Sequence, residues 1–156
     1  MLTLRPMTAE EYDHYADAMW EDYAHERARN LGTALEQERA VAAQQRAQLV
    51  PEGWRTPGQR FWCLLDESGA RVGQLWIFLD AEKQQAFLYD IAVDAPSRGR
   101  GYGKQALEQL EAHVRPLGVK RIALNVFGDN AVAMHLYRQT GYRTVATSMQ
   151  KDLGEG

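Results

Sequence analysis

The sequence predicts an α/β sandwich, of the α+β kind, in which a mixed and mostly antiparallel central sheet is flanked by helices. Two observations lead to this fold class. Strand-like segments rich in aromatic and branched residues follow one another through the middle of the chain, at residues 59–66, 72–79 and 86–94. Helical segments precede these strands, and a further helix crosses over to the strands that come after it.

The first part of the chain predicts a short strand at residues 2–5 and then two helices. Thr8 and Glu11 have the spacing of a capping box, and so do Thr33 and Glu36, which places one helix start near each pair. The first helix repeats large side chains every three or four residues, at Tyr12, Tyr15, Met19 and Tyr23. The second helix is expected to stop before Pro51.

The second part of the chain predicts alternating elements after a hairpin turn at residues 67–69. A helix that begins near Gly103 carries one apolar face, made of Ala106, Leu107, Leu110 and Val114. A strand containing Ile122, Leu124 and Val126 follows, then a helix over residues 130–140 that ends at Gly141. Residues 142–149 are expected to form the last strand.

Length, charge and cysteine content limit the class of protein. A chain of 156 residues fits one domain, residues 1–156, and its net charge of −3 gives no basic surface for nucleic acid, so no nucleic-acid partner is expected. The single cysteine, Cys63, excludes an internal disulfide and lies in an apolar run typical of a packed strand thiol.

No metal site and no membrane partner are expected. The four histidines show no paired ligand spacing. The longest apolar runs, such as residues 75–79, are too short to span a bilayer, and the acidic stretch near the start does not continue as a signal sequence. These observations predict a cytoplasmic protein.

The strongest functional signal is a glycine-spaced turn between a strand and a helix. Its residues are Arg98, Gly99, Arg100, Gly101, Tyr102, Gly103 and Lys104. Such a turn collects unpaired backbone N–H groups and the positive end of the helix dipole at one point, and the basic side chains add positive charge. The turn is therefore expected to bind a diphosphate or polyphosphate.

Two common phosphate motifs do not fit this turn. A P-loop needs a glycine where Arg98 stands and a serine or threonine where Gln105 stands. A dinucleotide fingerprint needs a third glycine where Lys104 stands, and an acid about twenty residues further on, where residues 118–121 have none. The spacing therefore disfavours Walker chemistry and NAD or FAD.

The turn does match the Arg/Gln-x-x-Gly-x-Gly/Ala signature, and two neighbouring segments strengthen the match. The strand at residues 88–94 precedes it, and residues 130–142 contain an Asn-x-x-Ala-x-x-x-Tyr pattern followed by Gly-Tyr. In this order and spacing the chain resembles a bacterial single-domain member of the GCN5-related N-acetyltransferase (GNAT) superfamily. The resemblance is close over residues 59–153 and looser before them.

The resemblance implies that acetyl-CoA is the co-substrate, and it implies a role for each residue that matches the family's motifs. The glycine turn would hold the pyrophosphate. The backbone N–H of Ile91 would bind the acetyl oxygen and that of Val93 the pantetheine arm, while Tyr137 would protonate the leaving thiolate. The implied coenzyme-binding positions outside the turn are Ile91, Ala92, Val93, Asn130, Ala133 and Tyr137. Asn130 is also placed to cap a helix.

The general base is left open. Relatives carry a glutamate at the positions of Asn125 or Phe87, and this chain has no acid at either one. Asp90 is the first candidate for a catalytic base, with Asp129, Glu26 and Tyr89 after it, and a proton relayed by solvent is an equal alternative.

The function implied is transfer of an acetyl group to a primary amine of a small molecule or peptide. An acidic and aromatic group suited to a cationic amine lies near the first helices: Trp20, Glu21, Asp22, Tyr23, Glu26 and Trp54. The alternative is a non-catalytic acyl-CoA-binding sensor. A homodimer is left open.

Overall fold

The computed structural model describes residues 1–154. It contains a five-stranded sheet in the order β1-β2-β3-β4-β5, with every neighbouring pair antiparallel except β4 and β5, which are parallel. The strands are β1 (Thr3–Pro6), β2 (Gln59–Leu65), β3 (Arg71–Asp80), β4 (Gln85–Val93) and β5 (Arg121–Leu124). The helices are α1 (Ala9–Leu31), α2 (Leu35–Leu49), α3 (Tyr102–Val114) and α4 (Ala131–Gln139). The mixed, mostly antiparallel sheet that the sequence predicts is confirmed.

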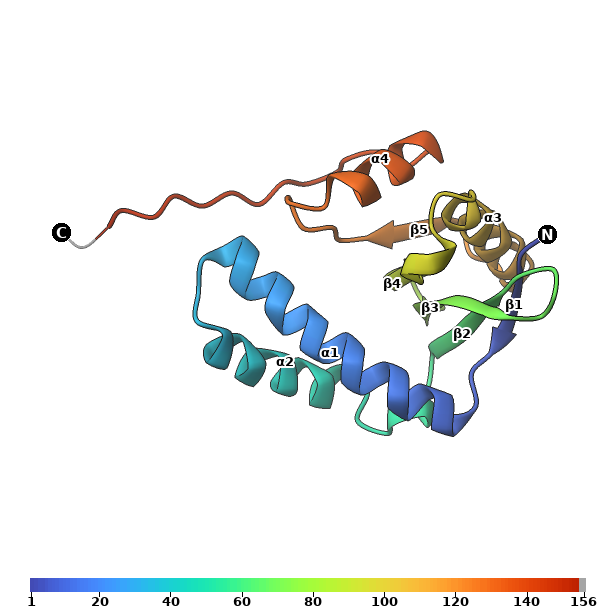
Figure 1. The fold of residues 1–156 in the computed structure, drawn as a ribbon, viewed down its shortest axis with the longest axis horizontal. Coiled ribbons are helices and arrows are strands. Elements are labelled where there is room, and N and C mark those ends of the chain that lie inside the picture. Colours follow the sequence, from blue (N-terminus) through green and yellow to red (C-terminus); the bar gives the residue numbers. More distant parts are fainter. Residues whose placement is uncertain (155–156) are drawn as a thin grey trace.

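The helices cover the two faces of the sheet and form a core on each side (Figure 1). Residues alternate between the faces along β2, because successive strand side chains point in opposite directions. Trp62 and Leu64 pack with the apolar face of α3. Phe61 and Cys63 pack on the side of α1 and α2. Cys63 is buried, as the sequence predicts for a strand thiol.

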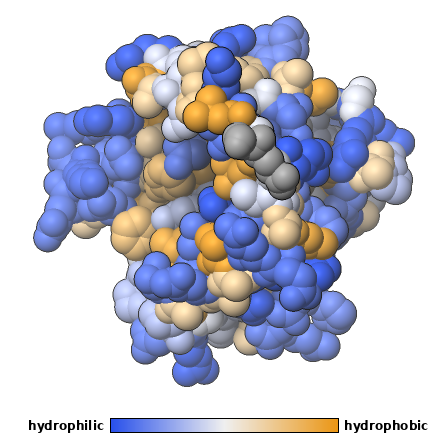
Figure 2. Space-filling view, turned by 90° about the vertical axis from the view of Figure 1, so that its left-hand side faces the viewer, coloured by the Kyte–Doolittle hydropathy of each residue, from blue (hydrophilic) through white to orange (hydrophobic). Residues whose placement is uncertain are grey.

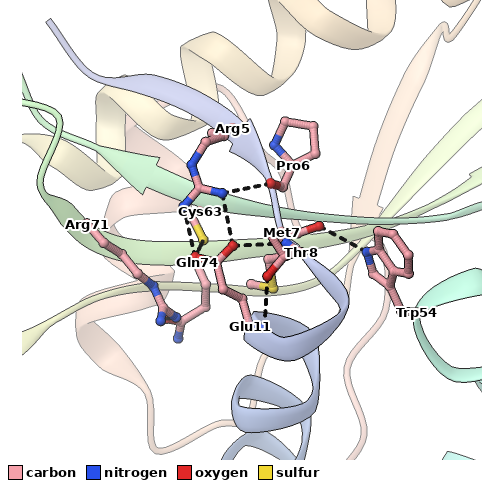
Figure 3. Close-up of polar contacts among 9 residues, drawn as sticks. All are labelled: Arg5, Pro6, Met7, Thr8, Glu11, Trp54, Cys63, Arg71 and Gln74. Atoms are coloured by element: carbon pink, nitrogen blue, oxygen red, sulfur yellow. Dashed lines mark hydrogen bonds and ion pairs between the residues drawn. The ribbon is translucent and has the colours of Figure 1, made fainter.

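The junction between β1 and α1 is held by polar contacts (Figure 3). Thr8 and Glu11 form the predicted capping box, in which the Glu11 N–H donates to Thr8 Oγ1 at 3.1 Å and the Thr8 N–H donates to Glu11 Oε1 at 2.9 Å. Arg5 donates to both carboxylate oxygens of Glu11, at 2.9 and 2.8 Å. These hydrogen bonds from Arg5 hold the pKa of Glu11 well below its usual range. The contact fixes the direction in which α1 leaves the sheet.

The second predicted capping box is wrong. Helix α2 begins at Leu35, its N-cap position is Ala34, and that position has no side-chain hydrogen bond. Gly32 adopts a left-handed conformation at φ 70°, and the N–H groups of Gly32 and Thr33 both donate to the Ala28 carbonyl. The N–H of Thr33 therefore helps to close α1, while its Oγ1 has no hydrogen-bond partner in the described residues and caps neither helix.

The predicted last strand, residues 142–149, is also wrong. After α4 the chain continues without secondary structure, and every residue from Arg143 to Gly154 is exposed. Figure 1 shows this segment running away from the sheet and past the end of α1. We call residues 143–153 the C-terminal segment. The residue pattern favours a strand, but within residues 1–154 the segment pairs with none of the five strands.

Two negative findings apply to residues 1–154. No helix among them combines the length and the apolar character needed to cross a membrane. No three histidine, cysteine, aspartate or glutamate side chains in this part of the chain are grouped so that they could hold a metal ion.

Candidate active site

Strands β4 and β5 separate halfway along β4. Their parallel pairing begins at Gln85 and Arg121 and ends at Leu88 and Leu124, although β4 continues to Val93. A bulge accompanies the separation, since Trp76 pairs with Asp90 and Ile77 with Leu88, which leaves Tyr89 as an extra residue. Beyond Leu88 the edge of β4 that faces β5 is therefore free.

The free edge carries the N–H groups of Ile91 and Val93. The Asp94 N–H donates to the Val72 carbonyl at 2.8 Å, so alternation along the strand directs the Ala92 N–H toward β3 as well. The N–H groups of Ile91 and Val93 then point away from β3, along the free edge of β4. The carbonyl of Val93 supports this assignment, because it accepts a 2.9 Å hydrogen bond from Arg98 Nε on that side.

The glycine turn presents backbone donors next to this edge. Gly99 and Gly101 both have φ 79°, and a Cβ built at either glycine meets nothing within 4 Å. Helix α3 begins after Gly101 without a side-chain cap. Within residues 1–154, none of the N–H groups from residue 99 to residue 104 donates a hydrogen bond. The turn is thus an exposed nest of free amides at a helix N-terminus.

Other residues of the turn have structural tasks. Arg98 fixes the turn to the end of β4 through Val93. A Cβ on Gly103 would lie 3.0 Å from Leu136 Cδ2, so this glycine allows α3 to approach α4 closely. Gln105, which stands where a P-loop has a hydroxyl, accepts a 3.0 Å hydrogen bond from the Leu2 N–H and ties α3 to β1.

Asp90 lies at the bulge and is bound to α1. The Tyr15 hydroxyl donates to Asp90 Oδ2 at 2.7 Å. Burial raises the pKa of the Asp90 carboxyl to about 6, although the hydrogen bond from Tyr15 lowers it. Glu26 and Asp22 are close enough to raise this pKa further. A carboxyl with this pKa is charged at neutral pH and can still accept a proton.

Tyr137 lies on α4 and is half-buried. Burial raises the pKa of its hydroxyl to about 12, and the Asp90 charge contributes in the same direction. Tyr137 therefore stays protonated at neutral pH and lies within electrostatic reach of Asp90. Two turns earlier, Asn130 Oδ1 accepts a 3.1 Å hydrogen bond from the Ala133 N–H, so Asn130 caps α4.

A hollow of about 2370 Å³ joins these elements. It is lined by six of the predicted site residues: Asp90, Ile91, Ala92, Asn130, Ala133 and Tyr137. Val93 and the glycine turn lie outside this lining, beside it. The structure therefore gathers the predicted catalytic positions in one hollow and the predicted phosphate-binding positions at a neighbouring turn.

The other candidates for the base are placed differently. Glu26 and Tyr89 line the hollow, and burial raises the pKa of each. Asp129 lies outside the lining of the hollow and is bound by Arg29 and Asn30, and the hydrogen bond from Arg29 lowers its pKa. Asp129 is thus engaged in an ion pair, which makes it a poorer proton acceptor than Asp90 or Glu26.

Of the six residues expected to bind the acceptor, four line the hollow and two do not. Asp22, Tyr23 and Glu26 line the hollow. Trp20 also lines it, but its ring is largely buried against Trp76. The remaining two members have other partners: Glu21 accepts hydrogen bonds from Arg39, and Trp54 donates to the Met7 carbonyl.

Tyr15 is the residue of this site that the sequence did not indicate. Its position on the apolar repeat of α1 predicts a core side chain, and its ring is indeed buried. Its partner Asp90 is 75 residues away in the sequence, so no local spacing could reveal the hydrogen bond. The only signal is a hydroxyl on a buried helix face, which needs a polar partner.

Fold and site together define a class of protein, that of enzymes which transfer acyl groups. The family model described as "Acetyltransferase (GNAT) family" matches residues 5–142. The chain therefore belongs to the GNAT family of acetyltransferases, and it is an acyltransferase.

Relatives agree over nearly the full length. The uncharacterized N-acetyltransferase YycN of Bacillus subtilis is 36% identical over 97% of this chain and 99% of its own. Its crystal structure superimposes with a TM-score of 0.94 at 35% identity, covering 99% of this chain and 100% of that one. The PaiA N-acetyltransferase of Thermoplasma acidophilum, solved in complex with coenzyme A, shares the fold with a TM-score of 0.69 at 16% identity, over 95% of this chain and 93% of that one.

Proposed function

We propose that the protein transfers the acetyl group of acetyl-CoA to a primary amine of a small molecule or peptide, by direct attack within a ternary complex. The observation that carries this proposal is the free edge of β4 between the nest of amides and the Asp90–Tyr137 pair. The amides at one end of this edge can bind a pyrophosphate, and the side chains of Asp90 and Tyr137 at the other end can accept and donate protons. An extended thioester lying along that edge would connect them.

The coenzyme would be held mainly by backbone donors. Free amides of residues 99–104 would bind the pyrophosphate, because a helix N-terminus and a nest both favour anions. The Val93 N–H would hold the pantetheine arm, and Asn130 and Ala133 would line its path. The Ile91 N–H would donate to the acetyl oxygen, where negative charge develops when the amine attacks.

Proton transfers are assigned to two side chains. Asp90 would take a proton from the ammonium group of the acceptor, directly or through water, which frees the nitrogen lone pair. The nitrogen would then attack the carbonyl carbon to form the C–N bond, and the C–S bond would break. Tyr137 would give its proton to the departing thiolate and regain one, through water, from the nitrogen that has attacked, and the products would be the amide and coenzyme A with a free thiol.

The acceptor is proposed to be cationic. Asp22, Glu26 and Asp90 put carboxyl groups along the hollow, and Tyr23 and Tyr89 add aromatic faces. Carboxylates and aromatic faces both favour an ammonium group. The sensor alternative is not carried forward, because the chain belongs to an enzyme family.

The test is thiol release from acetyl-CoA across a panel of amines. The panel contains polyamines, aminoglycosides, amino acids and lysine-containing or N-terminal peptides, each paired with its quaternary N-methylated analogue, whose nitrogen has no lone pair to attack the thioester. The proposal predicts release with at least one cationic amine and none with its analogue. Thiol release that proceeds at the same rate without any amine would contradict it, because the enzyme would then be a hydrolase.

A further inference from the structure

Arg27 on α1 lines the hollow and is held there by a buried acid. Its Nε donates to Glu38 Oε2 on α2 at 3.1 Å. Glu38 is 2% exposed and does not line the hollow, whereas the Arg27 side chain is 22% exposed and does. The guanidinium carbon of Arg27 also lies 5.8 Å from the centroid of the Tyr23 ring. Two neighbours therefore fix the position of this cation at the wall of the hollow.

The guanidinium of Arg27 keeps free hydrogen-bond donors. An arginine side chain has five N–H donors in one plane. Glu38 accepts from one of them, and the Tyr23 hydroxyl is near enough to accept from one more. At least three donors are left, and none of the Arg27 nitrogens is buried without a partner in the described part of the chain. A carboxylate is the ligand that such a planar group can bind at two points.

Joining α1 to α2 does not by itself explain a buried ion pair at this position. In the described residues these helices share two further ion pairs, both between exposed side chains: Arg39 with Glu21 and Arg46 with Asp17. Burying a carboxylate costs free energy, and well-packed apolar residues often hold an interface as well as a buried ion pair does. The buried pair is better explained by a task for the guanidinium that faces the hollow.

The guanidinium of Arg27 lies at a distance from the proposed base. Tyr15 on α1 contacts Asp90, and Tyr23 follows eight residues later on the same helix. Eight residues of an α-helix extend over about 12 Å, and the guanidinium lies over the Tyr23 ring. The hollow therefore contains a carboxyl group that can accept a proton and a fixed cation on the order of 10 Å from it.

The Arg27 end of the hollow lies near the surface. Gln150 Nε2 donates to the Leu31 carbonyl at 2.7 Å, one turn of α1 beyond Arg27, so the C-terminal segment passes this end. Figure 2 looks onto the side of the molecule where α1 ends, and it shows a recess with apolar residues in and around it. The rings of Tyr23 and Phe127 both line the hollow, with centroids 6.1 Å apart. Apolar groups of a ligand would find contacts here beside the cation.

We propose that Arg27 binds a carboxylate of the acceptor. The amine end of this inference rests on the proposed function, in which Asp90 takes a proton from the attacking amine. The acceptor then carries its amine and its carboxylate on the order of 10 Å apart. The α-amine of a free amino acid does not fit, because one carbon atom separates it from the carboxylate. An extended peptide of two to four residues spans roughly 7–14 Å, so short peptides with free termini do fit.

The experiment is calorimetric titration of the full chain, saturated with coenzyme A so that no reaction takes place. The titrants are di-, tri- and tetrapeptides of alanine and of leucine with a free amine, each paired with its C-terminal amide. The proposal predicts that at least one free acid binds tenfold or more tightly than its amide, because the two-point contact with the guanidinium is lost in the amide. Thiol release from acetyl-CoA with the same pairs should show this preference in KM and little of it in kcat.

The variants separate the guanidinium from the helix contact. Arg27→Gln with Glu38→Gln removes both charges, leaves two amides that can pair, and should bind acid and amide equally. The control is Arg46→Gln with Asp17→Asn, which removes an exposed ion pair between the same helices outside the hollow and should keep the preference of the parent. Arg27→Lys keeps the charge without the planar donors and should keep only part of the preference. Near-ultraviolet circular dichroism and the dissociation constant of coenzyme A check that each variant folds.

The outcomes distinguish this site from the proposed function. Equal affinity for acid and amide in the parent would overturn the carboxylate site, and so would the lack of binding of any peptide. A preference that both Arg27 variants keep in full would overturn it as well. Thiol release without discrimination between acid and amide would leave the proposed function standing and remove the carboxylate site. Selective binding of the acids with no thiol release from any amine would support the carboxylate site and contradict acetyl transfer.

Discussion

Asp90 on β4 accepts a 2.7 Å hydrogen bond from the Tyr15 hydroxyl on α1. This contact joins the bulge of the sheet to the helix that borders the hollow. It also sets the proton affinity of the carboxyl, because burial raises the pKa of Asp90 to about 6 while Tyr15 lowers it. The Tyr15–Asp90 hydrogen bond therefore both joins α1 to the sheet and affects the pKa of the proposed base.

The first prediction concerns the pH dependence of the rate. If Asp90 is the base, kcat/KM rises with pH and levels off above about pH 6, because the carboxyl must be charged. Tyr15→Phe removes the bond that lowers this pKa and moves the midpoint upward. Asp90→Asn removes the rise. If Asp90→Asn keeps the pH profile of the parent, the general base is Glu26 or solvent and not Asp90.

The second prediction concerns stability. The folded pKa of Asp90, about 6, is above its value of 3.8 in the unfolded chain. Between these pH values the folded state binds more protons, so the free energy of unfolding falls as pH rises through this window. Asp90→Asn removes this loss and keeps an acceptor for Tyr15. At pH 7 it should stabilise the protein by on the order of 2 kcal/mol relative to the parent, measured by urea denaturation at pH 4 and pH 7.

The third prediction concerns the general acid. Tyr137→Phe should lower kcat by roughly 10²–10⁴-fold and leave the dissociation constant of acetyl-CoA unchanged. The matched control is Tyr142→Phe, since the two rings are 5.5 Å apart and the Tyr142 hydroxyl is buried without a partner within residues 1–154. The control should keep the parent rate. If Tyr137→Phe keeps the same kcat as the control and the parent, Tyr137 is not the general acid.

The fourth prediction concerns the glycine turn. Gly101→Ala and Gly69→Ala introduce a Cβ at φ 79° and 84°, and at neither site does the Cβ meet an atom within 4 Å. Each should destabilise the fold by about 1–2 kcal/mol, because the left-handed conformation strains alanine. Only Gly101→Ala should weaken acetyl-CoA binding, by calorimetry. Equal binding in both variants would show that the open space beside Gly101 is not used.

The fifth prediction separates the two threonines that the sequence treats alike. Thr8→Ala should cost about 1 kcal/mol in the free energy of unfolding, because it removes a helix cap. Thr33→Ala should be neutral or slightly stabilising, since its Oγ1 is buried without a hydrogen bond in the described part of the chain. Thermal unfolding of both variants checks this, and a reversed order would contradict the assigned caps.

Local patterns predicted most of the fold. The capping box at Thr8, the apolar face of α3 and the glycine at position 101 each depend on neighbours within a few residues, so their spacing is informative. The capping box at Thr33 failed because the turn that closes α1 at Gly32 leaves Thr33 one position before the N-cap of α2, which is Ala34. The strand at residues 142–149 failed because pairing requires a partner, and a strand pattern does not say where the partner lies.

The same distinction between local patterns and long-range contacts applies to the residues of the site. The sequence led to Asp90, Tyr137 and the turn because they lie in contiguous motifs. It could not indicate Tyr15, since the contact with Asp90 arises only when α1 packs on the sheet. The bulge at Tyr89 is equally a property of two paired strands and not of one.

The central claim is that free backbone amides of residues 99–104 bind the pyrophosphate of a thioester carrier. Calorimetric titration of the unmodified protein with acetyl-CoA and with S-acetylpantetheine, which has no phosphate groups, tests it most directly. We predict that acetyl-CoA binds about 100-fold more tightly, because two charge-assisted hydrogen bonds are worth about 3 kcal/mol or more. Equal affinity for the two thioesters would contradict the account.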